Sequence, residues 1–374
     1  MLSYWESKSF LFHPDVLIVG GGIVGLSAAL WAKKLNPQAS VLLIERGNLP
    51  SGASTKNAGF ACFGSIGELI DDLKASPEAE VLALVKNRFE GLKLLRETLG
   101  DEAINYVPCG GYELFLENES RHFAKCSSQI KAFNEKIQQL MQLENTYSVA
   151  SDQIREFGFS GVREFIFNQH EGALDTGKMM RALWKKCVEM DVVTLTGIGA
   201  EQLETGNDSI IVKLSNGYQI NASTVIVATN AFARQLLPAL DVKPARAQVL
   251  ITEPIEKLPF SGAFHFDKGY YYFRNIDNRI LLGGGRNLDF ETETTYEMGL
   301  TNLVQEELEH YLHTLILPRH NAKIAQRWSG IMGLGENKKT ILERLDKNLV
   351  VAVRMGGMGV ALGSLVGKRA AEMI

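Results

Sequence analysis

The chain has 374 residues, 45% of them hydrophobic and 22% charged, with a formal net charge of −4 and an isoelectric point near 6.0. This length suits two domains with sizeable cores, and the composition is that of an ordinary globular protein. The mild negative charge argues against a nucleic-acid-binding surface and against a polybasic membrane patch. We therefore expect small-molecule partners and no nucleic acid.

The cysteines and the apolar runs argue against a disulfide-rich protein, a metal-binding protein and a transmembrane protein. Four widely spaced cysteines, at positions 62, 109, 126 and 187, form no C-x-x-C pair, so we predict neither a disulfide framework nor a metal site, and we expect a cytoplasmic protein. Residues 16 to 32 are uncharged but are interrupted by three consecutive glycines, and we predict no transmembrane segment. Residues 1–13 form an arm whose aromatic residues, Tyr4, Trp5, Phe10 and Phe12, should pack onto the body; the alternative is that they bind a partner.

The first strongly patterned stretch begins at Asp15. Four apolar residues, 16 to 19, predict a buried strand, and the alanine-rich residues after Gly25 predict a helix. Between them lies a G-x-G-x-x-G spacing, in which Gly20 permits the turn, Gly22 lets a pyrophosphate approach, and Gly25 allows close packing of helix on strand. The free N–H groups of the first helical turn would then face the phosphates.

A second predicted strand, residues 41–44, ends at Glu45, 20 residues after Gly25, where a ribose-binding carboxylate belongs. Strand, glycines, helix, strand and acid together predict a dinucleotide site. The competing interpretation is a buried strand-turn-helix without a ligand. Residues 49–60 are small and polar, and beside such a site they could offer hydroxyls and N–H groups to phosphates and to a ring; alone, they would read as a surface loop.

The middle of the chain alternates between helical and extended patterns. We predict helices over 66–100, about 119–144 and 177–189, strands over 106–116, 164–167 and 192–195, and a hairpin over 209–220 that turns at Asn216-Gly217. A buried strand at 222–231 then ends in Ala228, Thr229 and Asn230. Because the carboxyl ends of parallel strands line the ligand crevice, these three residues should meet the cofactor.

The last third resumes with strands. They are predicted over 247–252, 269–274 and 279–285, and the last two are joined by a turn at 275–278. A helix over about 296–313 carries His310 and His313, which we interpret as lying on a solvated face rather than binding a metal. We also predict a strand over 349–353, a glycine turn over 355–359 and a helix over 360–373. The N-terminus of this last helix should point toward the ligand crevice.

The order of these motifs resembles the D-amino-acid oxidase family of flavoproteins, which includes glycine oxidase and sarcosine oxidase. The resemblance covers nearly the whole chain and rests on residues 15–25 with Glu45, 52–59, 227–231, 244–248, 272–275 with 279–284, and 356–362. It implies an α/β fold: a Rossmann-like FAD-binding domain with a central parallel sheet, and a substrate domain on a larger mixed or antiparallel sheet with helices. The FAD-binding domain would comprise 14–75, 175–235 and 327–374, and the substrate domain 76–174 and 236–326.

The resemblance implies FAD as the cofactor. Its contacts would be Gly20, Gly22, Ile23, Val24, Gly25, Glu45, Arg46, Ser54, Asn57, Ala58, Gly59, Phe60, Ala228, Thr229, Asn230, Gly356, Gly357, Met358, Gly359 and Val360. The last four, Gly357 to Val360, would lie against the flavin's pyrimidine edge, where a helix N-terminus stabilises the negative charge of the reduced ring. No cysteine follows Cys187, so the covalent link of the sarcosine-oxidase type is not expected.

The substrate side depends on one predicted strand. A period of two puts Tyr270, Tyr272 and Arg274 on one face and residues 271 and 273 on the other. An arginine flanked by tyrosines can hold a carboxylate bidentately, and by the resemblance Arg274 matches the carboxylate-binding arginine of glycine oxidase and its relatives. The alternative is a surface salt bridge. Arg246 and Arg286 are further candidates.

Two lysines of the sarcosine oxidases, which grip the carboxylate and promote reaction with oxygen, are replaced by Ala361 and Leu281. The electron acceptor, oxygen or another molecule, therefore stays open, as does a homo-oligomeric state. The predicted function is oxidation of the C–N bond of an amino acid or amine by hydride transfer to flavin N5, after which the imine hydrolyses. The alternatives are a dehydrogenase of a hydroxy acid or glycerol-phosphate type substrate, and a non-catalytic flavin-binding redox subunit.

Overall fold

The computed structural model describes all 374 residues. A six-stranded sheet has the order β18-β19-β12-β1-β2-β8. Its members are β1 (Val16–Val19), β2 (Val41–Glu45), β8 (Val193–Thr196), β12 (Thr224–Val227), β19 (Leu349–Val353) and the antiparallel edge strand β18 (Ile341–Asp346). The other five strands are parallel, and four of them are apolar except for Glu45 and Thr224, because both faces of the sheet are covered.

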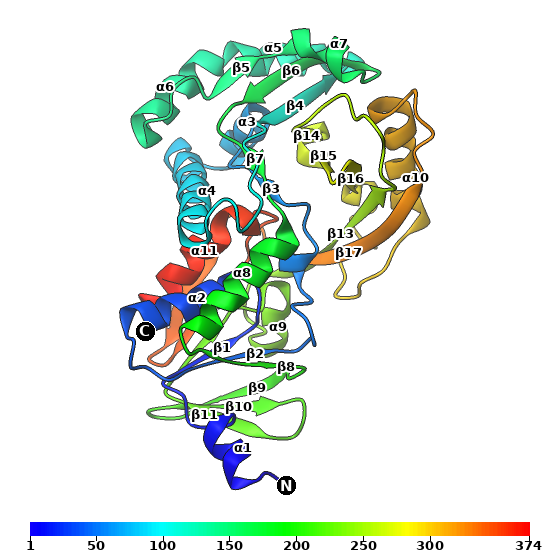
Figure 1. Cartoon of the computed structure of the whole chain (residues 1–374). Helices are drawn as coiled ribbons and strands as arrows, with labels where there is room; N and C mark the ends of the chain where they lie inside the picture. The colour runs from blue at the N-terminus through cyan, green and yellow to red at the C-terminus, as the bar shows by residue number, and fades with distance from the viewer.

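The two faces of this sheet have different covers. Helices α2 (Ile23–Leu35) and α11 (Gly359–Ala371) share one core with Ile18 and Leu43, joined by α8 (Thr176–Glu189). The opposite face, with Leu17 and Leu42, packs against a small antiparallel sheet of β9 (Ala200–Thr205), β10 (Ile210–Leu214) and β11 (Gln219–Ala222). Figure 1 shows this small sheet beside the N-terminal helix α1 (Tyr4–Ser9). Helices on one face and a second sheet on the other thus bury the parallel strands.

A second, eight-stranded sheet has the order β17-β13-β16-β15-β14-β4-β6-β5, and only β14 and β4 pair in parallel. Its strands are β4 (Gly111–Leu116), β5 (Tyr147–Val149), β6 (Val162–Asn168), β13 (Lys243–Thr252), β14 (Ala263–Phe266), β15 (Tyr271–Ile276), β16 (Arg279–Gly284) and β17 (Ile324–Leu334). One face packs Phe264 and Phe273 against α10 (Asn302–Tyr311) and the π-helix Leu312–Ile316. The mixed α/β architecture predicted from the sequence is confirmed.

The remaining elements connect or cover the two sheets. They are α3 (Ile66–Ala75), α4 (Glu78–Leu99), α5 (Ser120–Ser128), α6 (Ile130–Met141), α7 (Ile154–Phe157), α9 (Ala233–Leu236) and the two-stranded ribbon of β3 (Phe60–Ala61) and β7 (Gly172–Ala173). In Figure 1, α5 to α7 lie over the end of the large sheet farthest from α1. No helix in the structure is long and apolar enough to span a bilayer.

Several predicted element boundaries were wrong. The helix expected over 66–100 is two helices, because Pro77 cannot continue a helix and restricts Ser76 before it. The helix expected over 119–144 is also two, divided at Gln129. The strand expected from residue 106 starts only at Gly111. Strand β17 runs to Leu334, so the domain boundary predicted at residue 327 falls inside one strand of the large sheet.

The N-terminal arm also differs from its prediction. The side chains of Tyr4 and Trp5 are each 68% exposed, and that of Phe10 is 50% exposed. Only Leu11 and Phe12 pack against the core. Helix α1 has six residues and buries none of them, so its aromatic side chains do not pack onto the body as predicted.

Candidate active site

The first part of the site is the glycine turn between β1 and α2. Gly20 has φ +111°, and a Cβ atom there would lie 2.8 Å from the carbonyl oxygen of Ala228. A Cβ atom at Gly25 would lie 1.9 Å from the carbonyl oxygen of Gly20. The backbone therefore approaches itself so closely that only glycine fits at these two positions.

The amides at the start of α2 are available to a ligand. Ser54 Oγ accepts a hydrogen bond from the N–H of Ile23 at 3.0 Å, but the N–H groups of Val24 and Gly25 have no acceptor in the protein. At the end of the neighbouring strand β12, Thr229 Oγ1 is buried and also without a partner. Unpaired donors gathered at a helix N-terminus fit the pyrophosphate of a dinucleotide.

Glu45 ends β2 beside this turn, and its side chain is 7% exposed. Its Oε2 accepts the N–H of Gly21 at 2.8 Å, and its Oε1 accepts the N–H of Gly47 at 2.9 Å. These bonds fix the orientation of the carboxylate and leave lone pairs that ribose hydroxyls could use. The next residue, Arg46, is exposed and stacks its guanidinium 3.6 Å from the ring centroid of Phe232.

The loop of residues 52–59, which we call the cofactor loop, is held by its own Asn57. The side-chain amide of Asn57 donates to the carbonyls of Ala53 and Ser54 at 3.2 and 3.0 Å, and its Oδ1 accepts the N–H of Gly59 at 2.8 Å. Gly59 has φ +73°, and a Cβ atom there would lie 2.2 Å from the carbonyl oxygen of Leu174. The side chain of Asn57 therefore holds the conformation of the loop through hydrogen bonds within the loop itself.

A second glycine turn precedes α11. Gly356 and Gly357 have φ values of +59° and +84°, and the helix that follows has no side-chain cap. The N–H groups of Gly359 and Val360 consequently have no acceptor in the protein. Asn230, at the end of β12, accepts the N–H of Arg354 at 3.2 Å and so ties this turn to the parallel sheet. Two uncapped helix N-termini thus flank the cofactor loop.

Strand β15 brings two of the predicted substrate residues to this loop. Arg274 is 4% exposed, and its Nη1 donates to the carbonyl oxygens of Leu174, Gly59 and Ala58 at 2.7, 3.0 and 3.3 Å. Its Nη2 makes no hydrogen bond within the protein. Burial lowers the pKa of Arg274 from its ordinary value, yet a guanidinium so strongly basic stays charged at neutral pH. A surface salt bridge, the alternative for Arg274, is excluded.

Tyr272 lies on the same face of β15 as Arg274, because Phe273 between them points into the opposite core. Its ring meets that of Phe60 edge-on, with 5.6 Å between centroids. Burial raises the pKa of Tyr272 to about 12, so its phenol is neutral and able to donate a hydrogen bond.

Three other predicted residues do not join this group. Tyr270 precedes β15, is 37% exposed, and packs against Phe290 with 6.0 Å between ring centroids. Arg246 is on the opposite face of the large sheet, where its Nε lies 2.7 Å from a carboxylate oxygen of Glu293. Arg286 stacks on Phe290, 4.6 Å from its ring centroid. The period of two fails at Tyr270 because the strand starts one residue later.

Strand β17 contributes residues that the sequence interpretation missed. Trp328 Nε1 donates to the carbonyl of Lys56 at 2.9 Å, and a Cβ atom at Gly330 would lie 2.6 Å from Cβ of Lys56. Met332 Sδ would lie 3.5 Å from a Cβ atom at Gly357. The only sequence signal for these residues is the alternation of Trp328, Gly330 and Met332. That alternation indicates one face of an ordinary strand and does not indicate a contact with the cofactor loop. The contact of β17 with both glycine-rich segments exists only in the folded protein.

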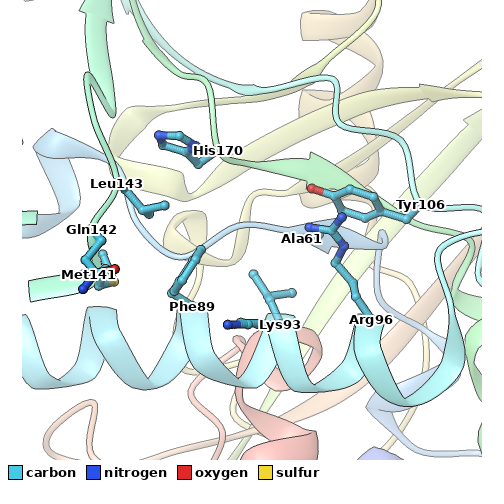
Figure 2. A pocket seen from close by; sticks show the side chains of 10 residues that line it. Ala61, Phe89, Lys93, Arg96, Tyr106, Met141, Gln142, Leu143 and His170 are labelled. Carbon is cyan, nitrogen blue, oxygen red and sulfur yellow. The ribbon is translucent and has the colours of Figure 1, made fainter. Parts of the chain in front are cut away.

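A pocket of about 400 Å³ lies apart from these residues, beside α4. Figure 2 shows Phe89, Lys93 and Arg96 of α4 facing Tyr106 and His170 across it. Arg96 stacks on Tyr106, 3.8 Å from its ring centroid, and also binds Asp101 with both nitrogens, at 2.7 and 2.8 Å. None of the predicted cofactor or substrate residues lines this pocket.

Comparison with known proteins identifies the family. The model of the DAO family, described as FAD dependent oxidoreductase, matches residues 15–373. The chain therefore belongs to this family; it is an enzyme, and its cofactor is FAD. The predicted family, enzyme class and cofactor are confirmed.

Individual relatives are distant but cover nearly the whole chain. The "Probable oxidoreductase OrdL" of Haemophilus influenzae is 22% identical, over 97% of this chain and 83% of that protein. The gamma-glutamylputrescine oxidoreductase of Escherichia coli (strain K12) is 26% identical, over 96% of this chain and 83% of that protein. The crystal structure of glycine oxidase from Geobacillus kaustophilus matches with a TM-score of 0.78 at 20% identity, over 96% of this chain and 94% of that one. This structural likeness shows a shared fold.

Proposed function

We propose that this protein oxidises the C–N bond of an amino acid or amine to an imine, which then hydrolyses in water. FAD, bound without a covalent link, supplies the hydride acceptor at its N5 atom. The observation that carries the proposal is that Arg274 and Tyr272 share one face of β15 and both contact the cofactor loop or its continuation, Phe60. The names of two relatives, a gamma-glutamylputrescine oxidoreductase and a glycine oxidase, also point to amine substrates.

Arg274 and Tyr272 would orient the substrate. Three carbonyl oxygens hold Nη1 of Arg274, while its Nη2 is free to bind a substrate carboxylate. The neutral phenol of Tyr272 can donate a hydrogen bond beside it. If the amine binds in its neutral form, no general base is required, and a fixed orientation supplies most of the rate enhancement.

The cofactor side of the proposal uses both helix N-termini. The amides of Val24 and Gly25 and the hydroxyl of Thr229 would bind the pyrophosphate, and Glu45 the ribose. The amides of Gly359 and Val360 would face the pyrimidine edge of the flavin. We further propose the predicted domain division, with the whole of β17 (Ile324–Leu334) assigned to the substrate domain, a cytoplasmic location, and oxygen or another small molecule as the electron acceptor.

Anaerobic addition of substrates tests the proposal. An amino acid or amine should bleach the oxidised flavin spectrum, and admission of air afterwards shows whether oxygen accepts the electrons. Reduction by hydroxy acids or by glycerol phosphate, but by no amine, would select the dehydrogenase alternative. An oxidised spectrum that persists with every donor would instead indicate a non-catalytic subunit and contradict the proposal.

Substitution of Arg274 tests its role. Arg274→Lys keeps a positive charge and part of the carbonyl contacts but loses the planar fork, so KM for a carboxylate substrate should rise at least about tenfold with a smaller change in kcat. Arg286→Lys, at a residue that stacks on Phe290, is the matched control and should leave KM unchanged. An unchanged KM in Arg274→Lys would remove Arg274 from the substrate site.

A further inference from the structure

A row of three polar side chains crosses the large sheet on the face that meets the cofactor loop. His265 of β14 pairs with Tyr272 of β15 on one side and with Glu113 of β4 on the other. Phe264 and Tyr112, next to two of them in sequence, point into the opposite core, so the three polar side chains share one face. Side chains paired across neighbouring strands have Cβ atoms about 5 Å apart, and each member of the row is therefore within reach of the next.

His265 is the member of the row whose ring lacks a partner. Its Nδ1 is buried and makes no hydrogen bond. Burial lowers the pKa of His265 to about 4, so the ring is a neutral imidazole, with one nitrogen that donates and one that accepts. The ring of Tyr272 leans away from it, over β16, since a Cβ atom at Gly283 would lie 2.6 Å from that ring. Because Arg274 pairs with Ala263, it lies diagonally across from His265, and a substrate amine held beside Arg274 can reach the imidazole.

Glu113 ends the row as a buried carboxyl that is 4% exposed. The start of α3 lies directly on it: its Oε2 accepts the N–H of Gly67 at 3.0 Å, and a Cβ atom at Gly67 would lie 1.9 Å from its Oε1. Burial, with smaller contributions from Glu68 and Glu119, raises the pKa of Glu113 to about 7, although hydrogen bonds from Gly67 and Ser65 oppose the rise. A buried acid that exchanges its proton near neutral pH, on the face of a substrate site, is suited to proton transfer.

The other titratable groups that face Glu113 come from α3, from α5 and the residue before it, and from β5: Glu68, Glu119, Cys126 and Tyr147. Burial raises the pKa of Cys126 to about 12 and that of Tyr147 well above its ordinary value, so both stay neutral. Glu68 forms ion pairs with Arg88 at 3.1 Å and with Lys338 at 2.9 Å. Glu119 accepts the N–H of Leu116 at 2.8 Å. These four groups are thus neutral or engaged, and Glu113 is the acid next to His265 that can take up a proton.

We propose that His265 and Glu113 form a proton relay that deprotonates the substrate amine before hydride transfer. Amines are mostly ammonium ions at neutral pH, whereas the nitrogen needs its lone pair when the hydride leaves the neighbouring carbon. In the relay, an N–H bond of the ammonium breaks and its proton bonds to the accepting nitrogen of His265. The proton on the other nitrogen passes to the carboxylate of Glu113, directly or over one water, so His265 stays neutral and nothing is oxidised. The inference rests on the proposed function and adds a proton acceptor to it.

Glu113→Gln makes the direct test, because the amide still accepts the N–H of Gly67 but takes up no proton. The probe is the fastest reductant among glycine, N-methylglycine, racemic alanine and putrescine. The rate constant of anaerobic flavin reduction divided by the dissociation constant is measured from pH 6 to pH 10. In the wild type it should rise with an apparent pKa near 7, and in the variant only near the pKa of the amine itself, about 8 to 10. The variant should be at least about tenfold slower at pH 7 and within about twofold of the wild type at pH 10, where the amine arrives neutral.

Two further variants separate a relay from a structural role. His265→Gln forms hydrogen bonds but passes no proton, so it should show the same loss, and the double variant should lose no more than either single one. Glu171→Gln is the matched control. The Oε2 of this equally buried acid would lie 2.0 Å from a Cβ atom at Gly111, which pairs with Ala263 and not with His265. Glu171→Gln should keep the step near pH 7, and flavin absorbance checks that each protein retains FAD.

The outcomes distinguish the relay from the proposed function. An unchanged pH profile in Glu113→Gln, a loss that persists at pH 10, or a step that disappears only in Glu171→Gln would overturn the relay and leave amine oxidation standing. If neither these four compounds nor any other amine reduces the flavin, the proposed function fails, and the relay fails with it.

Discussion

The glycine turn after β1 and the apolar wall, an apolar cluster on the large sheet, are built in two different ways. The members of the wall are Ala58, Phe60, Val249, Ile251, Tyr272, Ile276, Leu281 and Trp328. In the turn, Gly20 and Gly25 lie five residues apart, and the carbonyl of Gly20 excludes a side chain from position 25 at 1.9 Å. In the wall, Ala58, Val249 and Trp328 are brought together from three distant segments. The turn is therefore defined by local sterics, and the wall by the pairing of strands.

This difference explains why the turn and the wall present different chemical groups. The turn presents backbone N–H groups, whose chemistry is the same in any sequence that folds this way, and it suits the constant part of the cofactor. The wall presents side chains, which can change without disturbing the backbone. The following predictions test this division between the turn and the wall.

Gly25→Ala should have the largest effect. Its Cβ atom would lie 1.9 Å from a backbone oxygen, so α2 must move away from β1 and carry its amides with it. We expect FAD binding at least about a hundredfold weaker, measured as flavin absorbance per chain during dialysis. Gly52→Ala is the matched control, because a Cβ atom there meets nothing within 4 Å, and it should retain the flavin. Full retention of FAD by Gly25→Ala would contradict the steric argument.

The buried carboxyl of Glu171 should make the stability of the folded protein depend on pH. Glu171 accepts two backbone amides of the segment that follows the cofactor loop, and burial raises the pKa of this carboxyl to about 7. The folded protein thus binds a proton that the unfolded chain releases near pH 4.3. The free energy of unfolding should therefore fall as the pH rises from about 4.5 to 7, by on the order of 2 kcal/mol for this group.

Urea unfolding at pH 5 and pH 8 measures this effect against Glu171→Gln, which keeps an acceptor but cannot ionise. Burial also raises the pKa of Glu113 to about 7, which adds to the slope, and lowers that of His265 to about 4, which opposes it. Both groups are present in wild type and variant, so their contributions cancel in the comparison. Equal pH dependence in the two proteins would show that Glu171 ionises normally.

Trp328→Phe should have the smallest effect. It removes the hydrogen bond to the carbonyl of Lys56, so the free energy of unfolding should fall by about 1 kcal/mol, and FAD should bind a few times more weakly. Trp5→Phe is the control, because that side chain is 68% exposed and makes no such bond. If Trp328→Phe weakened FAD binding as much as Gly25→Ala does, the distinction between the turn and the wall would be contradicted.

Local patterns were sufficient for much of the molecule. The strand and helix around Gly20, the acid at Glu45 and the glycine turn before α11 all lie where the sequence predicted them. Predictions failed where the outcome depended on distant partners. Alternation along β15 placed Tyr272 and Arg274 correctly but could not locate the strand's first residue, and so Tyr270 was misplaced.

The sequence by itself determined the glycine turn between β1 and α2, because close backbone contacts there tolerate only glycine and leave a recognisable spacing. Only the tertiary structure decided that Arg274 rests on three carbonyls, that Arg246 faces Glu293 instead, and that Trp328 completes the apolar wall. Those facts depend on which strands pair and in which register. A linear pattern with a period of two does not specify either one.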